Sequence, residues 1–313
     1  MNQPFVSIVI PTHNRKEMLL RLLRSILESS YTKLEIIVID DASTDGTSNA
    51  IKTLFTNEDK IRVIRNSKNL YAAGSRNVGI KHAKGKYIFF IDDDNVLDRE
   101  AIGRLVEQFE KDKNIGELGL VNYSFVHKKQ VLWLYTSRNM WTSKTYLPNT
   151  FKDFFHNEIW DTVDVPNAFM IRADILKKNN IMFCSFFGIM YEESYVAYRI
   201  REVGYTIKVV RDAKIYHDVD DFMPHYMDDR RRLYVFARNR VIFHSLYSTK
   251  FQLLSIILFW IWAFMLYYAY LVFQYKSDKK YSFCEKMDLV MQYIKGNFRG
   301  IAFVIRREKL NYT

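Results

Sequence analysis

The chain has 313 residues, 49 % of them hydrophobic and 26 % charged, which excludes an intrinsically disordered protein and allows a large core. Its 46 Lys and Arg exceed its 35 Asp and Glu, and the formal net charge of +11 favours anionic partners without choosing among them. Cys184 and Cys284 lie far apart, which argues against a disulfide framework or a zinc site and favours an intracellular setting.

Short apolar runs and amphipathic stretches alternate strictly over the first hundred residues, and the N-terminal residues show no signal-peptide pattern. We expect strands at 5–10, where Pro11 stops the run, and at 34–40, 61–66 and 87–92. We expect helices at 15–30, within 41–55 and from residue 74. Strict alternation predicts an α/β fold with a largely parallel, doubly wound sheet.

Three polar segments follow directly after predicted strands: PTHNR at 11–15, DDAST at 40–44 and DDDN at 92–95. Ligands of such sheets bind beyond the carboxyl ends of the strands. The three segments are therefore expected to meet along one rim.

The pattern loosens after Gly116, with a long irregular stretch at 136–150. Order returns at 163–176, which predicts a strand followed by a helix, and at 192–205, a helix closed by Gly204. Two short strands are expected at 206–210 and 213–217.

Residues 251–275 carry no charge and are bracketed by Lys250 and Lys276, a length that suffices to cross a bilayer. Basic residues flank both ends, so the positive-inside rule gives no clear orientation. A re-entrant or in-plane helix pair would keep both basic flanks against anionic lipid headgroups, and we expect it in preference to a spanning helix. Apolar and basic residues alternate over 286–307, as in an interfacial helix. The alternative is a core helix packed against the enzyme or a second subunit.

The acidic triplet Asp92, Asp93 and Asp94 is the most unusual local feature, because three adjacent carboxylates repel one another. Oxygen ligands of this kind suit a hard divalent cation that also neutralises a diphosphate. A solvated acidic turn is the alternative.

Two further positions have both a binding and a structural interpretation. Asp41 follows a strand and could accept a hydrogen bond from a base, although the aspartates there could instead cap the next helix. Arg76 and Asn77 are expected at a helix start, where an arginine can meet a phosphate, although it could equally be a surface charge.

Competing nucleotide motifs are missing from the sequence. No GxGxxG follows a strand, and GIKHAKGKY at 79–87 has five residues between its glycines instead of the four of a P-loop. A dinucleotide oxidoreductase or an NTPase is therefore disfavoured.

The sequence resembles the family 2 glycosyltransferases with a GT-A fold. The segments VSIVIPTHNR, LEIIVIDDASTDGT, AAGSRNVGIKHAKGKYIFFIDDDN and YEESYVAYRIREVGY match its signature blocks in order and approximate spacing. The resemblance covers about residues 5–240 and is greatest to the branch of rhamnosyl- and galactofuranosyl-transferases of cell-surface glycans.

The resemblance implies a nucleotide-diphospho-sugar donor and a divalent cation, Mg²⁺ or Mn²⁺. The implied donor-binding residues are Pro11, Thr12, Asn14, Arg15, Asp41, Arg76, Asp92 and Asp93. The triplet would be the DxD motif of the family, with Asp94 as the main metal ligand, Asp92 as a second and His217 completing the coordination. His217 alone could equally be structural.

The catalytic base of the family is usually the Asp of an ED pair, which precedes an arginine on the same helix by six residues. Here Glu192 and Glu193 precede Arg199, so Glu193 takes the base position, with Glu192 beside it. Glutamate replaces aspartate, Tyr195 stands where a further Asp is usual, and FCS replaces the usual FDE upstream. A Glu pair at a helix start could also merely compensate the helix dipole.

The resulting prediction is a metal-dependent, inverting glycosyltransferase, with a GT-A domain at 1–240 and a membrane-associated helical region with a basic amphipathic tail at 241–313. Its partners would be a UDP-, dTDP- or GDP-sugar, a lipid-linked or glycan acceptor and an anionic membrane surface on the cytoplasmic side, with no nucleic acid. A homo-oligomer is compatible with the sequence. The alternative is a non-catalytic, membrane-tethered protein that binds nucleotide sugars or glycans.

Overall fold

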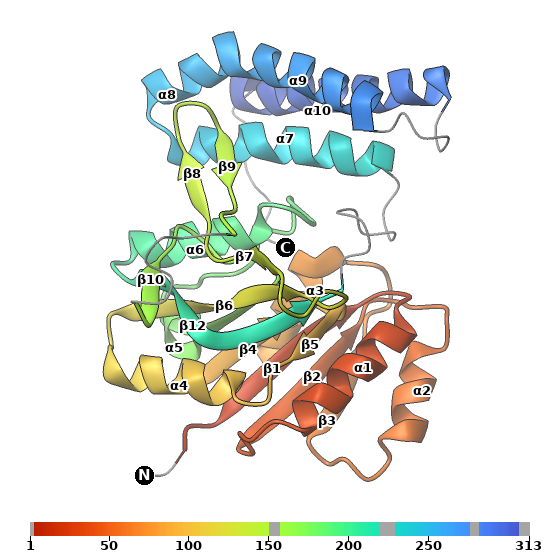
Figure 1. The fold of residues 1–313 in the computed structure, drawn as a ribbon, viewed down its shortest axis with the longest axis vertical. Helices are drawn as coiled ribbons and strands as arrows, with labels where there is room; N and C mark the ends of the chain where they lie inside the picture. The colour runs from red at the N-terminus through yellow and green to blue at the C-terminus, as the bar shows by residue number, and fades with distance from the viewer. Residues whose placement is uncertain (1–2, 150–156, 219–228, 276–281, 307–313) are drawn as a thin grey trace.

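The computed structural model describes residues 3–149, 157–218, 229–275 and 282–306. A twisted sheet flanked by helices forms one end of the molecule, and a stack of long helices forms the other (Figure 1). The α/β fold expected from the alternating pattern is confirmed.

The N-terminal half follows the predicted alternation of strands and helices. Its strands are β1 (Val6–Thr12), β2 (Leu34–Asp40), β3 (Ile61–Arg65) and β4 (Tyr87–Ile91). Its helices are α1 (Lys16–Leu27), α2 (Thr47–Leu54), α3 (Tyr71–His82) and α4 (Ala101–Lys111). Strand β1 pairs in parallel with β2 and β4, and β2 pairs in parallel with β3.

Two boundaries differ from the prediction. Pro11 does not end β1, which continues to Thr12 and remains in register with Asp40 of β2. Helix α3 begins at Tyr71, where φ is 58° and the amide donates to Asn69 Oδ1. Arg76 therefore lies in the second turn of α3, because the helix starts before Gly74 instead of at it.

The second half is mixed. Its strands are β5 (Asn95–Leu97), β6 (Ile115–Ser124), β7 (Val131–Trp133), β8 (Ser137–Asn139), β9 (Lys144–Tyr146), β10 (Ile159–Asp161), β11 (Ala168–Arg172) and β12 (Thr206–His217). Its helices are α5 (Ala173–Lys178) and α6 (Glu192–Glu202). Gly204, with φ of 92°, follows the end of α6 as predicted, because the left-handed region costs glycine little.

Two predictions for this half were wrong. The two short strands expected after Gly204 are one strand, β12, which stays continuous because it absorbs a register shift between Val210 and Lys214. The stretch expected to be irregular contains an antiparallel hairpin of β8 and β9. Strands of three residues carry too little alternation to be recognised in a sequence.

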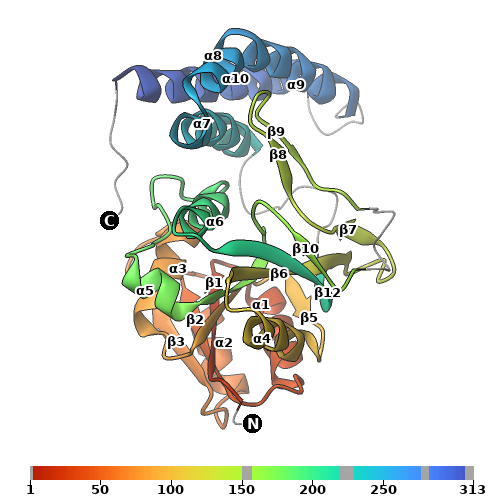
Figure 2. The ribbon, with the colours of Figure 1, turned by 90° about the vertical axis from the view of Figure 1, so that its left-hand side faces the viewer.

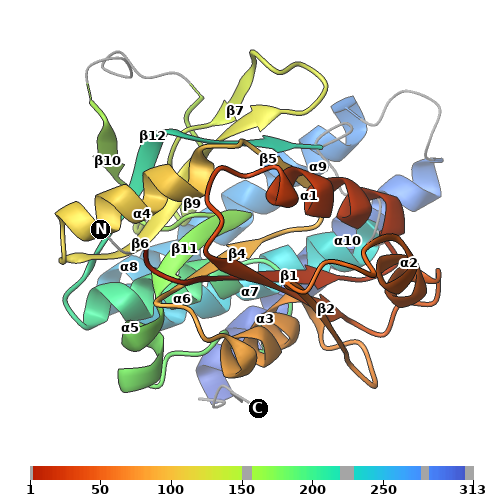
Figure 3. The same ribbon diagram turned by 90° about the horizontal axis from the view of Figure 1, so that it is seen from below.

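The described strands other than this hairpin form one sheet, with the path order β10-β12-β6-β11-β4-β1-β2-β3. Strand β11 runs antiparallel to both of its neighbours, β4 and β6. Helices α1, α2 and α4 pack on one face, and α3, α5 and α6 pack on the other (Figure 3). The central strands β1 and β4 are therefore buried on both faces, which explains their continuous apolar runs.

The C-terminal helices form a separate layer, with α7 between the sheet domain and the outer helices (Figure 2). They are α7 (Asp229–Tyr247), α8 (Lys250–Ser255), the π-helical segment η1 (Ile256–Trp260), α9 (Ile261–Tyr275) and α10 (Phe283–Arg306). Tyr268 of α9 stacks on Tyr293 of α10, with their ring centroids 4.3 Å apart.

Residues Lys250–Gln274 form the one helical stretch of the described chain that is long and apolar enough to cross a membrane. Only 17 % of its most apolar window is buried within the protein. This small share disfavours a core helix packed against the enzyme itself, and packing against a second subunit stays an alternative.

The packing of α10 on α7 gives a first testable prediction. A Cβ at Gly296 would lie 2.2 Å from the Tyr234 carbonyl oxygen, so Gly296→Ala should force the two helices apart. We expect a loss of about 1–3 kcal/mol in the free energy of unfolding, as for other overpacked sites. The measurement is denaturant unfolding of the detergent-solubilised protein.

Gly103→Ala in α4 is the matched control, because nothing lies within 4 Å of a Cβ at that position. It should stabilise the protein by about 0.5–1 kcal/mol through helix propensity. Equal shifts in the two variants would contradict the close packing of α7 against α10.

Candidate active site

The polar segments after β1, β2 and β4 meet at the carboxyl ends of these strands, as predicted. Hydrogen bonds join them: Thr12 Oγ1 donates to Asp93 Oδ2 at 2.7 Å, and the Asp41 amide donates to the Thr12 carbonyl oxygen at 2.8 Å. These residues come from three adjacent parallel strands, so the sheet order itself assembles the rim.

The three carboxylates of the acidic triplet are separated by two arginines. Arg15 Nη1 donates to Asp93 Oδ1 at 2.8 Å and to Asp94 Oδ2 at 2.9 Å. Asp92 turns to the other arginine and accepts from Arg76 Nη2 at 2.6 Å. The repulsion expected from the sequence is therefore offset by partners that lie far away along the chain.

Asp94 is the member of the triplet that lies beside His217. His217 Nε2 is 3.4 Å from Asp94 Oδ1, because β12 runs along β5 and places its last residue opposite Asn95. Burial opposes ionisation, but the contacts of Asp94 with His217 and Arg15 lower its pKa to about 2. Asp94 is thus an ionised carboxylate next to an imidazole.

The donor chemistry at this point fits a divalent cation, since carboxylate oxygens and an imidazole nitrogen are suitable ligands for Mn²⁺. Among the described residues, buried His217 Nδ1 has no hydrogen-bond partner, and Nε2 faces Asp94. Asp92 points to Arg76 and not to His217. Within the described residues, no three His, Cys, Asp or Glu side chains are already placed around one cation position.

Arg76 forms the centre of a second cluster, although an isolated surface charge was an open alternative. It is 1 % exposed, and besides Asp92 it donates to Glu192 Oε1 at 3.1 Å and to Glu193 Oε1 at 2.8 Å. The two glutamates begin α6, so Arg76 joins the second turn of α3 to the first turn of α6.

Glu192 and Glu193 differ in what surrounds them. The Glu192 side chain is 6 % exposed, and its buried Oε2 has no hydrogen-bond partner in the part of the chain that the structure describes. The Glu193 side chain is 17 % exposed, and its Oε1 accepts from Arg76 and from the Asn167 amide at 3.2 Å. Burial raises the pKa of Glu193 to about 8 and that of Glu192 to about 7, against the opposing charge of Arg76. Of the two, Glu193 is the better placed to meet a substrate.

The predicted base- and ribose-binding residues form a connected rim. Asn14 has φ of 54°, its amide donates to Ser43 Oγ at 3.0 Å, and its Oδ1 accepts from the Thr44 amide at 2.7 Å. Asp41 is buried and accepts from Asn66 Nδ2 and from the Leu70 amide, each at 2.8 Å. Pro11, which is partly buried, is held in the end of β1.

Sequence reasoning missed a cluster of three buried amides beneath the triplet. Asn167 Nδ2 donates to Asn95 Oδ1 at 2.9 Å and to Asn122 Oδ1 at 2.8 Å. The Asn167 carbonyl oxygen accepts from the Asp92 amide, while its own amide holds Glu193. Asn167 therefore ties the acidic triplet to the candidate base. Its only sequence signal is the Pro-Asn pair just before β11.

A second missed contact surrounds Arg138 of the β8–β9 hairpin. Arg138 Nη2 donates to Asp164 Oδ2 at 2.7 Å and to Ser194 Oγ at 3.0 Å, and its guanidinium lies 4.5 Å from the ring centre of Phe243. This network holds Ser194, the residue after Glu193, and it also links α6 to α7. No sequence motif marks it.

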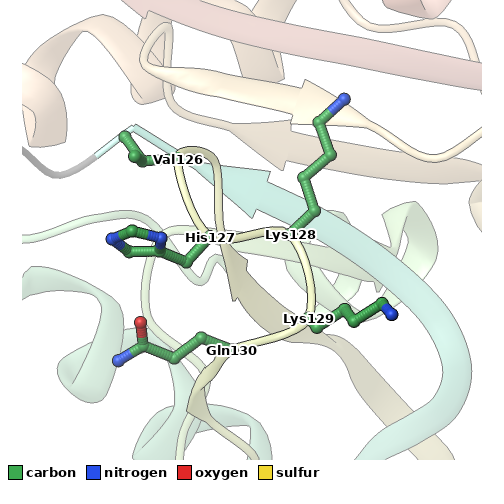
Figure 4. Close-up of a pocket in the computed structure, with 5 residues that line it drawn as sticks. All are labelled: Val126, His127, Lys128, Lys129 and Gln130. Carbon is green, nitrogen blue, oxygen red and sulfur yellow. The ribbon is translucent and has the colours of Figure 1, made fainter.

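An open hollow lies at the turn between β6 and β7, lined by Val126, His127, Lys128, Lys129 and Gln130 (Figure 4). A single loop forms it, and its lining contains none of the predicted site residues. The convergence of several strands at the acidic triplet is the stronger indication of function.

Comparisons with known proteins agree with the resemblance. The chain is 32 % identical over 119 residues to glycosyltransferase GlyG of Streptococcus pneumoniae, covering 38 % of this chain and 40 % of GlyG. It is 33 % identical over 106 residues to GalNAc(5)-diNAcBac-PP-undecaprenol beta-1,3-glucosyltransferase of Campylobacter jejuni, covering 34 % of each. The matches thus span less than half of either relative.

Among solved structures, the fold is similar to that of mannosyltransferase PcManGT from Pyrobaculum calidifontis in complex with GDP-Man and Mn²⁺. The TM-score is 0.62 at 18 % identity, covering 99 % of this chain and 89 % of that one. The expected GT-A fold is thereby confirmed. The family model for glycosyl transferase family 2 matches residues 7–194, more than half of the chain. The chain therefore belongs to glycosyl transferase family 2.

Proposed function

We propose that the protein is a metal-dependent, inverting glycosyltransferase that moves a sugar from a nucleotide-diphospho-sugar to a hydroxyl of a lipid-linked or cell-surface glycan. The observation that carries this proposal is the convergence of Asp94, Arg76 and Glu193 at the carboxyl ends of the central strands. Family membership supports the reaction type. Within the family, we propose the rhamnosyl- and galactofuranosyl-transferase-like branch.

On the donor side, Asp41 and Asn14 form the part of the rim that would receive the base and ribose, together with Pro11 and Thr12. Arg15 and Arg76 supply positive charge on either side of the triplet, where a diphosphate would lie. The GDP-Man complex of the structurally similar PcManGT supports a nucleotide-sugar donor.

Asp94 and His217, with Asp92, would hold a divalent cation, either Mg²⁺ or Mn²⁺. A cation bound there would neutralise charge on the diphosphate of the donor. Arg15 Nη1 contacts Asp94 Oδ2, so a cation at this oxygen would replace that contact. Arg15 would then donate to a phosphate oxygen while keeping its contact with Asp93.

Glu193 is the proposed general base, which removes the proton of the acceptor hydroxyl as that oxygen attacks the anomeric carbon in line. Arg76 holds the base through Oε1 and leaves Oε2 for the acceptor. Asn167 fixes the same oxygen through its backbone amide. Glu192, deeper in the protein, supports the position of Arg76.

We propose that the acceptor reaches the site from the side of the C-terminal helices. The proposed domain boundary at residue 240 lies within α7, which runs from Asp229 to Tyr247. We propose that α8 to α10 lie in the cytoplasmic interface of the membrane. The tight packing of α10 on α7 and the aromatic contacts between α9 and α10 support a layer that stays on the enzyme. The predicted basic segment at 276–280 lies outside the described residues.

The proposal is tested by incubating the purified protein with UDP-, dTDP- and GDP-sugars and Mn²⁺. Release of nucleoside diphosphate from one donor, with inversion at the anomeric carbon, would support it. A donor that binds without being consumed, with or without membrane glycolipids, would favour the alternative of a non-catalytic binding protein.

The raised pKa of Glu193 predicts a pH dependence. A base must be unprotonated to act, so the rate of donor consumption should rise as pH increases through about 8. Below that pH the rate should change about tenfold per unit. Initial rates from pH 6 to 9.5 with saturating donor and Mn²⁺ provide the measurement. The residual rate of the Glu193→Gln variant should not rise with pH in this way. If the rate of that variant rises in the same way, another group is responsible for the pH dependence.

The membrane mode gives a further prediction. High salt alone should not release the protein from membranes. Salt weakens the attraction between basic residues and lipid headgroups, but the exposed side chains of α8 to α9 are largely apolar and would remain bound to the lipid. A cysteine added at the C-terminus should resist labelling from outside the cell. Release by salt would contradict the apolar anchor, and labelling from outside would establish a spanning helix.

A further inference from the structure

Three arginines without a role in the reaction described above gather where the C-terminal helices approach the sheet domain. Arg231 and Arg238 lie two turns apart on α7, and Arg299 lies on α10. Gly296 and Gly300 bring the two helices together, since a Cβ at Gly300 would be 3.0 Å from the Arg238 carbonyl oxygen. The crowding of Arg299 toward Arg238 therefore follows from the helix packing.

An ion pair at this end of α7 joins Arg230 to Asp288 of α10, and it involves neither Arg231 nor Arg238. Arg238 is partly buried, and burial together with the charges of Arg299 and Arg231 lowers its pKa. Bringing like charges together in this way disfavours the charged forms unless an anion binds between them.

Two aromatic contacts connect the cluster to the segments that carry the candidate active site. The Arg231 guanidinium lies 4.6 Å from the ring centre of Tyr71, the first residue of α3, five residues before Arg76. Arg238 Nη2 donates to the Phe186 carbonyl oxygen at 3.1 Å, and its guanidinium lies 5.0 Å from the Phe186 ring centre. Phe186 belongs to the segment that leads into α6 and Glu193.

The helices of the same layer expose large apolar side chains. Leu258, Phe259 and Leu266 are exposed along η1 and α9, and Met291 and Phe298 are exposed along α10. In Figures 1 and 2 these helices lie beyond α7, on the side away from the sheet. The arginine cluster thus lies between an apolar surface and the candidate base, which is the order in which a lipid-linked acceptor presents its chain, its phosphates and its sugar.

We propose that Arg231, Arg238 and Arg299 form the binding site for the diphosphate of a lipid-linked acceptor. This inference rests on the proposed function and names its acceptor class. Guanidinium groups bind phosphate oxygens through paired hydrogen bonds, and a diphosphate offers enough oxygens for three of them. The relative from Campylobacter jejuni, whose name includes a PP-undecaprenol acceptor, supports the same chemistry.

The test uses the full chain and vesicles of phosphatidylcholine that contain either undecaprenyl diphosphate or phosphatidylglycerol at matched surface charge. We expect the protein to prefer the diphosphate vesicles. The double variant Arg231→Gln/Arg238→Gln should bind them about ten- to a hundredfold more weakly, as expected for the loss of charge-assisted hydrogen bonds. Binding to phosphatidylcholine alone should stay unchanged, because the apolar helices are intact.

Lys295→Gln is the matched control, since Lys295 is an exposed basic residue on the same α10. It should keep the preference for diphosphate, and Arg238→Lys should restore part of it relative to Arg238→Gln. The single variant Arg231→Gln, at an exposed position, keeps the test valid if the double variant misfolds.

An equal affinity of the unaltered protein for both vesicles would overturn the proposal, and so would an equal loss in Lys295→Gln. These outcomes are distinct from failure of the proposed function, because vesicle binding needs neither donor nor Mn²⁺. If the protein prefers diphosphate vesicles but never consumes a nucleotide sugar, the result supports the diphosphate site and contradicts the proposed reaction.

Discussion

Replacing Asp94 with alanine should abolish sugar transfer while leaving the protein folded. Asp94 is the ionised carboxylate next to His217 and the main proposed ligand of the cation. The rate of donor consumption should fall by at least about 10²–10³-fold, as for other single electrostatic contacts to a transition state. Donor binding in the presence of Mn²⁺ should weaken in the same variant.

The fold should survive because Arg15 keeps its contact with Asp93, and because removing one of three crowded carboxylates relieves repulsion. Thermal unfolding and Mn²⁺ titration of the variant provide the measurements. Asp98→Ala is the control, since Asp98 lies just after β5 and outside the cluster. Near-normal turnover by Asp94→Ala without added metal would refute the assignment of the metal site.

Replacing Glu193 with glutamine should leave donor binding normal and lower the rate by about 10²–10⁴-fold, the usual contribution of a positioned general base. Glutamine has the same shape, and its oxygen can still accept from Arg76 and from the Asn167 amide. The change therefore removes the proton acceptor with little disturbance of the cluster. Donor affinity and the rate of transfer should be measured on the same preparation.

Glu192→Gln is the matched comparison, one residue away on the same helix. Because Glu192 is buried and pairs with Arg76, its replacement should affect stability more than the chemical step. If Glu192→Gln alone shows the large loss in rate, the roles of the two glutamates are exchanged.

Regular patterning made the N-terminal half of the fold predictable. Strands β1, β2 and β4 are buried on both faces and show as apolar runs, and the polar segments after them come together because parallel strands end at one edge. The contact between Asp94 and His217 was predictable only from the family resemblance, because the two residues lie far apart in the sequence.

Side-chain contacts between segments far apart in the sequence could not be predicted, because no sequence pattern relates the two segments. Arg76 could equally have been a surface charge, and only the fold places it within hydrogen-bond distance of two glutamates at the start of α6. The same is true of Asn167 and Arg138, whose hydrogen bonds depend on a short strand and a hairpin. A polar residue that is buried by tertiary contact leaves no periodicity to recognise.

The most direct test of the proposed site is a crystal of the protein soaked with Mn²⁺ and a nucleoside diphosphate, with the metal located by its anomalous scattering. The proposal predicts a single strong peak between Asp94, His217 and the diphosphate, with the base near Asp41 and with Arg15 moved from Asp94 to a phosphate oxygen. A metal and nucleotide bound away from Asp94, for example in the hollow lined by residues 126–130, would contradict it.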